Sequence, residues 1–172
     1  IVLRSVADRF LSAIAKNKTV VLNPDQAAKV TGLVVKDGEI VKPLMGKDCP
    51  VILQQAGINV DNSVKLAVFV ADSISHPLVQ HEQLMPIVPI LIADTFEQAV
   101  DMACEVEHGF RHTAMVHSKD LSRITYYGQK IGTTNFIVNG ASQRSAGTLA
   151  TGGTSWTLAG ATGEGHTTPR TF

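Results

Sequence analysis

The chain lacks a charge excess of either sign, since fifteen lysines and arginines balance fifteen aspartates and glutamates and the formal net charge is zero. Proteins that bind nucleic acid or anionic membranes usually carry a basic patch, so the composition gives such partners no electrostatic support. Cysteine is scarce as well. Cys49 and Cys104 show no paired spacing, which argues against a disulfide framework and favours a reducing cytosol.

Long apolar runs are also missing, because none approaches the roughly 20 residues that a membrane-spanning helix needs. The first residues, Ile1 to Ser5, contain neither an initiator methionine nor the layout of a signal peptide, so we expect a piece of a longer protein. The chain has 172 residues, of which 44% are hydrophobic. That length can bury one sizeable core, and we expect residues 1–172 to form a single domain.

Helical and extended segments alternate along most of the chain. Val6, Phe10 and Ile14 fall four apart, which predicts a helix that ends near Asn17. Apolar and β-branched runs predict strands over residues 19–22, 65–71, 87–93, 113–117 and 134–138. Pro89 predicts an edge position or a bend in its strand, because proline has no N–H to donate. The alternation predicts an α/β fold with an open, largely parallel sheet and flanking helices.

Four helices are expected to begin at a polar capping residue. The caps are Asn23, with Pro24 at the first helical position, Asp48, Thr95 and Ser118. Thr95 and Gln98 have the spacing of a capping box. The expected buried faces are Phe96, Ala99, Val100 and Ala103 in the helix after Thr95, and Leu121, Ile124 and Ile131 in the helix after Ser118. Gly57, Gly109 and Gly132 are expected to end three of these helices.

Three segments carry a family signature. Residues 81–86 are His-Glu-Gln-Leu-Met-Pro, residues 107–114 are Glu-His-Gly-Phe-Arg-His-Thr-Ala, and residues 162–172 are Thr-Gly-Glu-Gly-His-Thr-Thr-Pro-Arg-Thr-Phe. Together they resemble the C-terminal half of the CoA-acylating aldehyde dehydrogenases of propanediol- and ethanolamine-utilising bacterial microcompartments. The resemblance runs along nearly the whole chain. It implies an aldehyde dehydrogenase catalytic domain whose nucleophilic cysteine and nucleotide-binding domain lie upstream of Ile1.

Glu82 is the first candidate site residue, because it puts a carboxylate directly ahead of a buried strand. Spacing alone favours a solvated helix residue, with Leu84 in the core. The resemblance implies instead that Glu82 contacts the ribose of the nicotinamide half of the cofactor. It also places Leu84 at the cofactor, where the family commonly has an aromatic residue.

His112 is the second candidate, at the start of a strand and after the helix-ending Gly109. An imidazole can exchange a proton near neutral pH, so proton transfer and thiolate stabilisation are both chemically available. A lone histidine is more often a hydrogen-bonded structural residue. The resemblance implies a histidine that acts near the thioester.

Cys49 attracts attention because it follows Asp48 at an expected helix start, where the helix dipole lowers the pKa of a thiol. The family resemblance implies that neither Cys49 nor Cys104 is the nucleophile, and we expect both to be structural. The six histidines show no ligand spacing beside a cysteine or aspartate, so no metal site is expected.

Asn139, Gly140, Ala141 and Ser142 follow the last expected strand. The resemblance implies that this loop lines the acyl pocket. The chain departs here from the family pattern, which has a Pro-Ser-aromatic start followed by Gly-Gly-Glu-Gly. The glycines at 152–153 and 163–165 do not lie between a strand and a helix, as a phosphate-binding fingerprint requires, so we expect tight turns there.

The implied activity is the NAD-dependent conversion of a small aldehyde and coenzyme A to acyl-CoA, with a homo-oligomer as the full-length protein. The implied location is cytoplasmic, with the interior of a bacterial microcompartment as a further option. The chain by itself is expected to be inactive, because the nucleophile would lie upstream. Two alternatives remain open. One is a hydrolytic aldehyde dehydrogenase, whose glutamate base would also lie upstream, and the other is a non-catalytic interaction or scaffold module.

Overall fold

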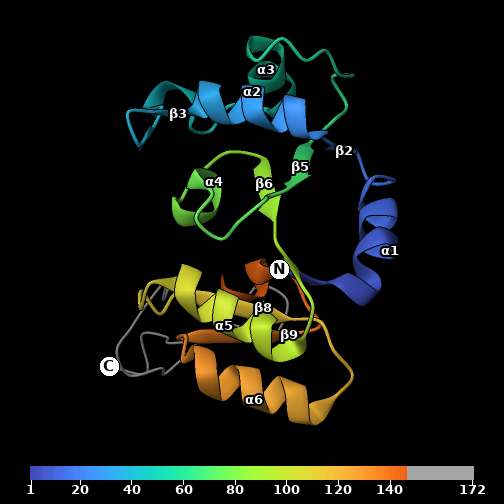
Figure 1. Cartoon of the computed structure of the whole chain (residues 1–172), viewed down its shortest axis with the longest axis vertical. Coiled ribbons are helices and arrows are strands. Elements are labelled where there is room, and N and C mark those ends of the chain that lie inside the picture. The colour runs from blue at the N-terminus through green and yellow to red at the C-terminus, as the bar shows by residue number, and fades with distance from the viewer. Residues whose placement is uncertain (147–172) are drawn as a thin grey trace. The chain divides into compact units, whose positions relative to one another are not determined.

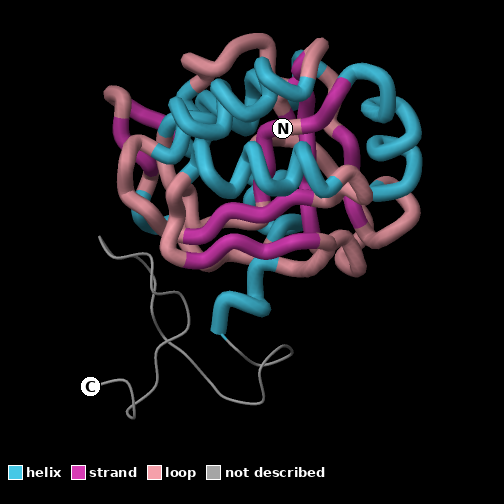
Figure 2. The backbone as a smooth tube through the Cα atoms, turned by 90° about the horizontal axis from the view of Figure 1, so that it is seen from below, coloured by secondary structure: helices cyan, strands magenta, loops and turns pink. Residues whose placement is uncertain are grey.

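A computed structural model describes residues 1–146 and assigns the chain to two compact units, Ile1–Ala99 and Val100–Phe172. Figure 1 labels the helices and the longer strands, and Figure 2 shows the same backbone coloured by secondary structure. The glycines at 152–153 and 163–165, and the signature segment at 162–172, lie outside the described residues.

A three-stranded parallel sheet forms the centre of the first unit. Its strands are β2 (Thr19–Val21), β5 (Leu66–Val70) and β6 (Ile87–Ile90), in the order β2-β5-β6. Phe69 on β5 is paired in register with Pro89 on β6. Because β6 is an outer strand of this sheet, the edge position predicted from Pro89 is confirmed.

The rest of the first unit consists of helices and short strands. They are β1 (Val2–Leu3), α1 (Arg4–Ile14), α2 (Pro24–Val34), β3 (Val35–Lys36), β4 (Glu39–Ile40), the 3₁₀ helix η1 (Lys42–Leu44), α3 (Cys49–Gln55), α4 (Pro77–Gln80) and β7 (Ile92–Ala93). β1 and β7 pair in parallel, whereas β3 and β4 form an antiparallel hairpin. α2 contacts α3 and β5, and α4 contacts β6 (Figure 1). The fully buried side chains include Phe69, Ile52, Leu53, Leu78 and Ile87.

The helix starts of the first unit show how well local capping can be predicted. At α2 the capping box is complete, since Gln26 N donates to Asn23 Oδ1 (2.9 Å) and Asn23 N donates to Gln26 Oε1 (3.0 Å). Asp48 holds the N-cap position of α3 but makes no side-chain capping bond. Before α5, Gln98 N donates to Thr95 Oγ1 (3.1 Å), while Gln98 Oε1 accepts from Asp94 N (2.7 Å). One bond of the capping box expected at Thr95 is therefore present, whereas the Gln98 side chain accepts from Asp94 N instead of Thr95 N.

The described part of the second unit is built around two parallel strands. Helix α5 (Phe96–Glu107) leads into it, followed by β8 (Thr113–Val116), α6 (Leu121–Ile131), β9 (Asn135–Val138) and the 3₁₀ helix η2 (Ser142–Ala146). Thr113 pairs with Asn135, and Val116 pairs with Val138. α6 packs on β9 through Tyr127, whose ring meets the Phe136 ring edge-on with centroids 5.4 Å apart. The α/β fold with parallel strands and flanking helices is confirmed.

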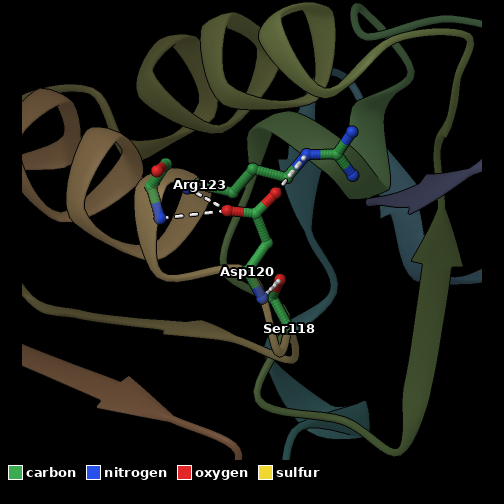
Figure 3. Close-up of polar contacts among 4 residues, drawn as sticks. Ser118, Asp120 and Arg123 are labelled. Atoms are coloured by element: carbon green, nitrogen blue, oxygen red, sulfur yellow. Dashed lines mark hydrogen bonds and ion pairs between the residues drawn. The ribbon is translucent and has the colours of Figure 1, made fainter.

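The start of α6 corrects one prediction. Asp120, not Ser118, is its N-cap: Asp120 Oδ1 accepts from Ser122 N (3.0 Å) and Arg123 N (3.2 Å), as Figure 3 shows. Ser118 acts one step earlier, because its Oγ accepts from Asp120 N (3.1 Å). Asp120 Oδ2 also lies 3.5 Å from Arg123 Nε. At the other end, Gly132 adopts a left-handed conformation (φ 56°) and ends the helix as predicted.

The expected buried faces are only partly right. Ile131 is buried and Ile124 is half-buried, but Leu121, the first residue of α6, is 75% exposed. In α5, Val100 is buried whereas Phe96, Ala99 and Ala103 are half-buried. The helical period located these helices correctly, but it did not define how wide a stripe the neighbouring elements cover.

Candidate functional site

Glu82 lies in the loop between α4 and β6 and is exposed. The expectation of a helical residue is wrong, since α4 ends at Gln80. The neighbouring Gln83 shapes the loop, because its side-chain amide donates to the carbonyls of Leu78 and His81. Glu82 thus presents an accessible carboxylate at the amino end of β6.

Leu84 in the same loop has an unusual backbone and an exposed side chain. Its φ is 52°, in the left-handed region that branched and bulky residues rarely adopt, and its side chain is 62% exposed. Its carbonyl accepts from Gly46 N at 3.0 Å, which ties the loop to the segment after η1. The alternative that Leu84 is a core residue is therefore wrong.

His112 ends a tight loop between α5 and β8. His108, Gly109 and Arg111 all have positive φ values of 55°, 74° and 56°. Two of these three are not glycine, and each such residue costs on the order of 1–2 kcal/mol unless the surroundings compensate. Backbone strain of this kind is frequent where a side chain must be aimed at a ligand or substrate.

Three contacts hold His112 itself. Its N–H donates to Glu107 Oε1 (3.0 Å), and its carbonyl accepts from Asn135 N (3.3 Å). Its ring stacks on the Phe110 ring with centroids 5.6 Å apart and an interplanar angle of 21°. The Phe110 ring also meets the ring of His108 edge-on, with centroids 5.8 Å apart and an interplanar angle of 60°. Family motifs do not single out Phe110 or Glu107, although the alternation of rings at 108, 110 and 112 is visible in the sequence.

The loop at residues 139–142 begins with Asn139, whose side chain makes hydrogen bonds to the backbone of another segment. Asn139 Oδ1 accepts from Ser118 N (3.0 Å) and Asn139 Nδ2 donates to Ser118 O (2.8 Å), so its amide pairs with both polar groups of one residue. Asn139 has φ 52°, a left-handed conformation that asparagine tolerates well. Its amide therefore joins the end of β9 to the turn before α6.

In the rest of that loop, the Arg144 side chain packs closely against Gly140. A Cβ added there would lie 2.8 Å from Arg144 Cδ, so a larger residue would displace the arginine side chain. Gly140 is buried, whereas Ala141 and Ser142 are exposed. Ala141 O accepts from Arg144 N (3.0 Å), which closes the first turn of η2. Asn139 is exposed as well, but its amide is engaged by Ser118.

The parallel register separates the two candidate groups of the second unit. His112 directly precedes β8, whereas Asn139 directly follows β9, and Asn139 N donates to Val116 O at the far end of β8. At about 3.3 Å per residue, their main chains are roughly 16 Å apart along the strands. His112 and residues 139–142 therefore lie at opposite ends of the strand pair. They can serve different groups of a substrate but not the same atom.

An open cavity of about 400 Å³ lies at the ends of α5 and α6. Glu107, Arg111, Lys130 and Cys104 are among its lining residues, and His112 is not. Burial is the main cause that raises the pKa of the Cys104 thiol, with Asp101 as the next contributor. A protonated thiol is a poor nucleophile, which agrees with a structural role.

Cys49 is 1% exposed, and burial raises the pKa of its thiol. Desolvation thus outweighs the helix-start effect that made this residue attractive in the sequence. Within residues 1–146, no cluster of three or more histidine, cysteine, aspartate or glutamate side chains could hold a metal ion. Over the same range, no helix combines the length and the apolar character that crossing a bilayer requires.

Comparison with known proteins gives a consistent result. The model of the aldehyde dehydrogenase family matches residues 2–169. The chain is 34% identical to the propanal dehydrogenase (CoA-propanoylating) of Salmonella typhimurium, covering 100% of this chain and 37% of that protein. It is 30% identical to the acetaldehyde dehydrogenase (acetylating) EutE of the same organism, covering 100% of this chain and 38% of the relative. The chain thus spans well under half the length of these relatives.

Solved structures agree with that similarity. A propionaldehyde dehydrogenase from the Clostridium phytofermentans fucose utilisation bacterial microcompartment superimposes with a TM-score of 0.91 at 33% identity, over 99% of this chain and 40% of that one. Two variants of the Clostridium protein have also been solved, one with a histidine and one with a cysteine replaced by alanine, at positions 118 residues apart. From the match over residues 2–169 and this superposition, the chain belongs to the aldehyde dehydrogenase family.

Proposed function

We propose that this chain is the C-terminal catalytic part of an NAD-dependent, CoA-acylating aldehyde dehydrogenase that converts a short aldehyde to its acyl-CoA. The observation that carries the proposal is the similarity to relatives named CoA-propanoylating and acetylating, which extends over the whole chain. In such an enzyme NAD accepts the hydride and coenzyme A takes the acyl group from a cysteine thioester. The cysteine and the nucleotide-binding domain belong to the upstream part of the protein.

Glu82 is our candidate for holding the cofactor. Its carboxylate is exposed on a loop tied down by Gln83 and Leu84, which fits an acceptor for the hydroxyl groups of a ribose. A charged acceptor of this kind contributes more than a neutral one. The exposed Leu84 side chain, in its left-handed turn, would contact the same cofactor through apolar surface.

His112 is our candidate for proton movement at the thioester. In the Clostridium propionaldehyde dehydrogenase, the replaced cysteine and histidine are 118 residues apart. With His112 at the place of that histidine, the same spacing would put the cysteine seven residues before Ile1, which agrees with the upstream nucleophile that the family resemblance implies. The strained, anchored loop around His112 supports the same role.

Residues 139–142 would form part of the acyl pocket. Asn139 would set the loop through its pairing with Ser118, while Ala141 and Ser142 would offer small side chains to the aldehyde. We further propose a single domain over residues 1–172, a homo-oligomeric full-length protein, and a cytoplasmic or microcompartment location.

The test uses the full-length protein that contains this chain. It is incubated with propanal and NAD, with and without coenzyme A, while NADH and the acyl product are measured. We expect NADH formation that requires coenzyme A and yields propanoyl-CoA in equal amount. The 172-residue chain alone should form no NADH. Propanoate formed without coenzyme A would instead identify a hydrolytic enzyme, and no turnover under either condition would refute an enzymatic role.

A further inference from the structure

We propose that Phe110 and Glu107 are positioning residues for His112: the phenyl ring holds the imidazole by its face, and the carboxylate holds the main chain that carries it. The inference rests on the function proposed above for His112. Neither Phe110 nor Glu107 needs to touch a substrate in this arrangement. Both act through the histidine.

The Glu107 carboxylate fixes the backbone on which His112 stands. The loop turns back through left-handed residues at 108, 109 and 111, a conformation that the local sequence does not favour by itself. The bond from His112 N to Glu107 Oε1 (3.0 Å) spans this loop from the last residue of α5. On the other side, His112 O accepts from Asn135 N. The main chain at 112 is thus held from both directions.

Phe110 fixes the ring. A phenylalanine that is 61% exposed gains little from burial, so its position must be explained by contacts other than a core. Its ring contacts are the stacked His112 (5.6 Å, 21°) and the edge-on His108 (5.8 Å, 60°). Offset and edge-on ring pairs of these kinds are the favoured geometries.

Stacking is well suited to a proton-transferring histidine. The contact uses the face of the imidazole, whereas both nitrogens lie on its edge and remain available to exchange protons. A hydrogen bond to one nitrogen would restrain the ring as well, but it would occupy one of those two atoms. The ring is restrained while its chemistry is preserved, as precise placement of a catalytic group requires.

The experiment is a double-mutant cycle in the full-length protein, with propanal, NAD and coenzyme A. Phe110→Leu should lower kcat by about 10- to 100-fold with KM values for aldehyde and NAD little changed, because misplacement of a reacting group costs rate rather than binding. Phe110→Tyr keeps the stacking ring and should restore kcat to within roughly twofold. In a His112→Asn background, Phe110→Leu should have no further effect, because its partner ring is gone.

Glu107 provides an independent pair. Glu107→Gln retains a side-chain oxygen that can accept from His112 N, so it should keep most of the rate, whereas Glu107→Ala should lose it. A measurement without turnover covers the case of a poorly folding variant: stacking shields the His112 ring protons, so their NMR resonances in the parent and in Phe110→Tyr should lie upfield of those in free histidine.

Each outcome separates this inference from the proposed function. If His112→Asn is fully active, the role proposed for His112 is wrong and the inference falls with it. If His112→Asn is impaired while Phe110→Leu and Glu107→Ala are fully active, only the inference is wrong. An equal loss from Phe110→Leu in both backgrounds would show that Phe110 acts on folding rather than through His112. His112 ring protons that resonate as in free histidine would also overturn the inference that Phe110 positions this ring.

Discussion

The role proposed for Glu82 at the cofactor can be tested by removing its charge. A hydrogen bond to a charged acceptor contributes on the order of 1.5–3 kcal/mol. Glu82→Gln in the full-length protein should therefore raise the KM for NAD, or slow the hydride step, by about tenfold or more. Steady-state kinetics over a range of NAD concentrations measure both effects.

The matched control is Glu39→Gln, which removes the same charge from the exposed β4 strand of the first unit. We expect no change in its NAD kinetics. If Glu82→Gln behaves like this control, Glu82 does not contact the cofactor.

A proton-transferring role for His112 predicts an effect that a purely structural role does not. If it moves a proton at the thioester, His112→Asn should reduce turnover by roughly 10²–10⁴-fold. The neutral limb of the pH–rate profile should also flatten, because imidazole is the side chain that changes charge between about pH 5 and 8. Turnover against pH and the melting temperature should be measured on the same preparation.

His117→Asn is the control for that variant, since His117 is exposed and directly follows β8. It should keep both the rate and the profile. A His112→Asn protein that melts earlier but retains the shape of the parent profile would leave His112 with a structural role only.

At the scale of the element, the start of α6 allows the capping residue Asp120 to be compared with Ser118, whose hydroxyl only binds the N–H of Asp120. Asp120 accepts two backbone N–H groups, whereas the Ser118 hydroxyl accepts only the N–H of Asp120. Loss of a capping side chain costs about 0.5–2 kcal/mol. Asp120→Ala should therefore lower the free energy of unfolding by that amount, and Ser118→Ala by less, as measured by urea denaturation. The reverse order would restore Ser118 as the cap.

Elements of this chain were predictable where the signal is local. The capping box at Asn23 and the glycine stop at Gly132 depend on residues within one helical turn, and both are confirmed. The cap of α6 was misassigned because Ser118 and Asp120 are both good capping residues two positions apart. The choice between them depends on where β8 ends, and Asn139, twenty-one residues later, anchors Ser118 there.

At the scale of the whole molecule, the stability of the protein should depend on Tyr127 at alkaline pH. Burial, with smaller contributions from Cys104 and Glu107, raises the pKa of Tyr127 from its ordinary 10.0 to about 12. Below pH 10 the hydroxyl is protonated in both the folded and the unfolded protein. Between pH 10 and about 12 only the unfolded protein ionises there, so its contribution to stability is lost as pH rises.

Tyr127→Phe should remove that part of the pH dependence. The measurement is the free energy of unfolding of parent and variant at one pH below 10 and one between 10 and 12, because the difference between the two proteins isolates this residue from other groups that titrate in the same range. An identical fall with pH in both proteins would show that Tyr127 ionises alike in the folded and unfolded states.

The sequence by itself determined the family, the order of the main helices and strands, and the edge position of β6, because these depend on motifs, periodicity and the missing N–H of Pro89. Only the tertiary structure decided the conformations of Leu84 and the His112 loop, and the placement of His112 and Asn139 at opposite ends of β8 and β9. The physical reason is the distance along the sequence over which each interaction acts. Helix caps and strands arise from neighbours along the chain, whereas strand register and left-handed loops are held by contacts between segments that the sequence keeps far apart.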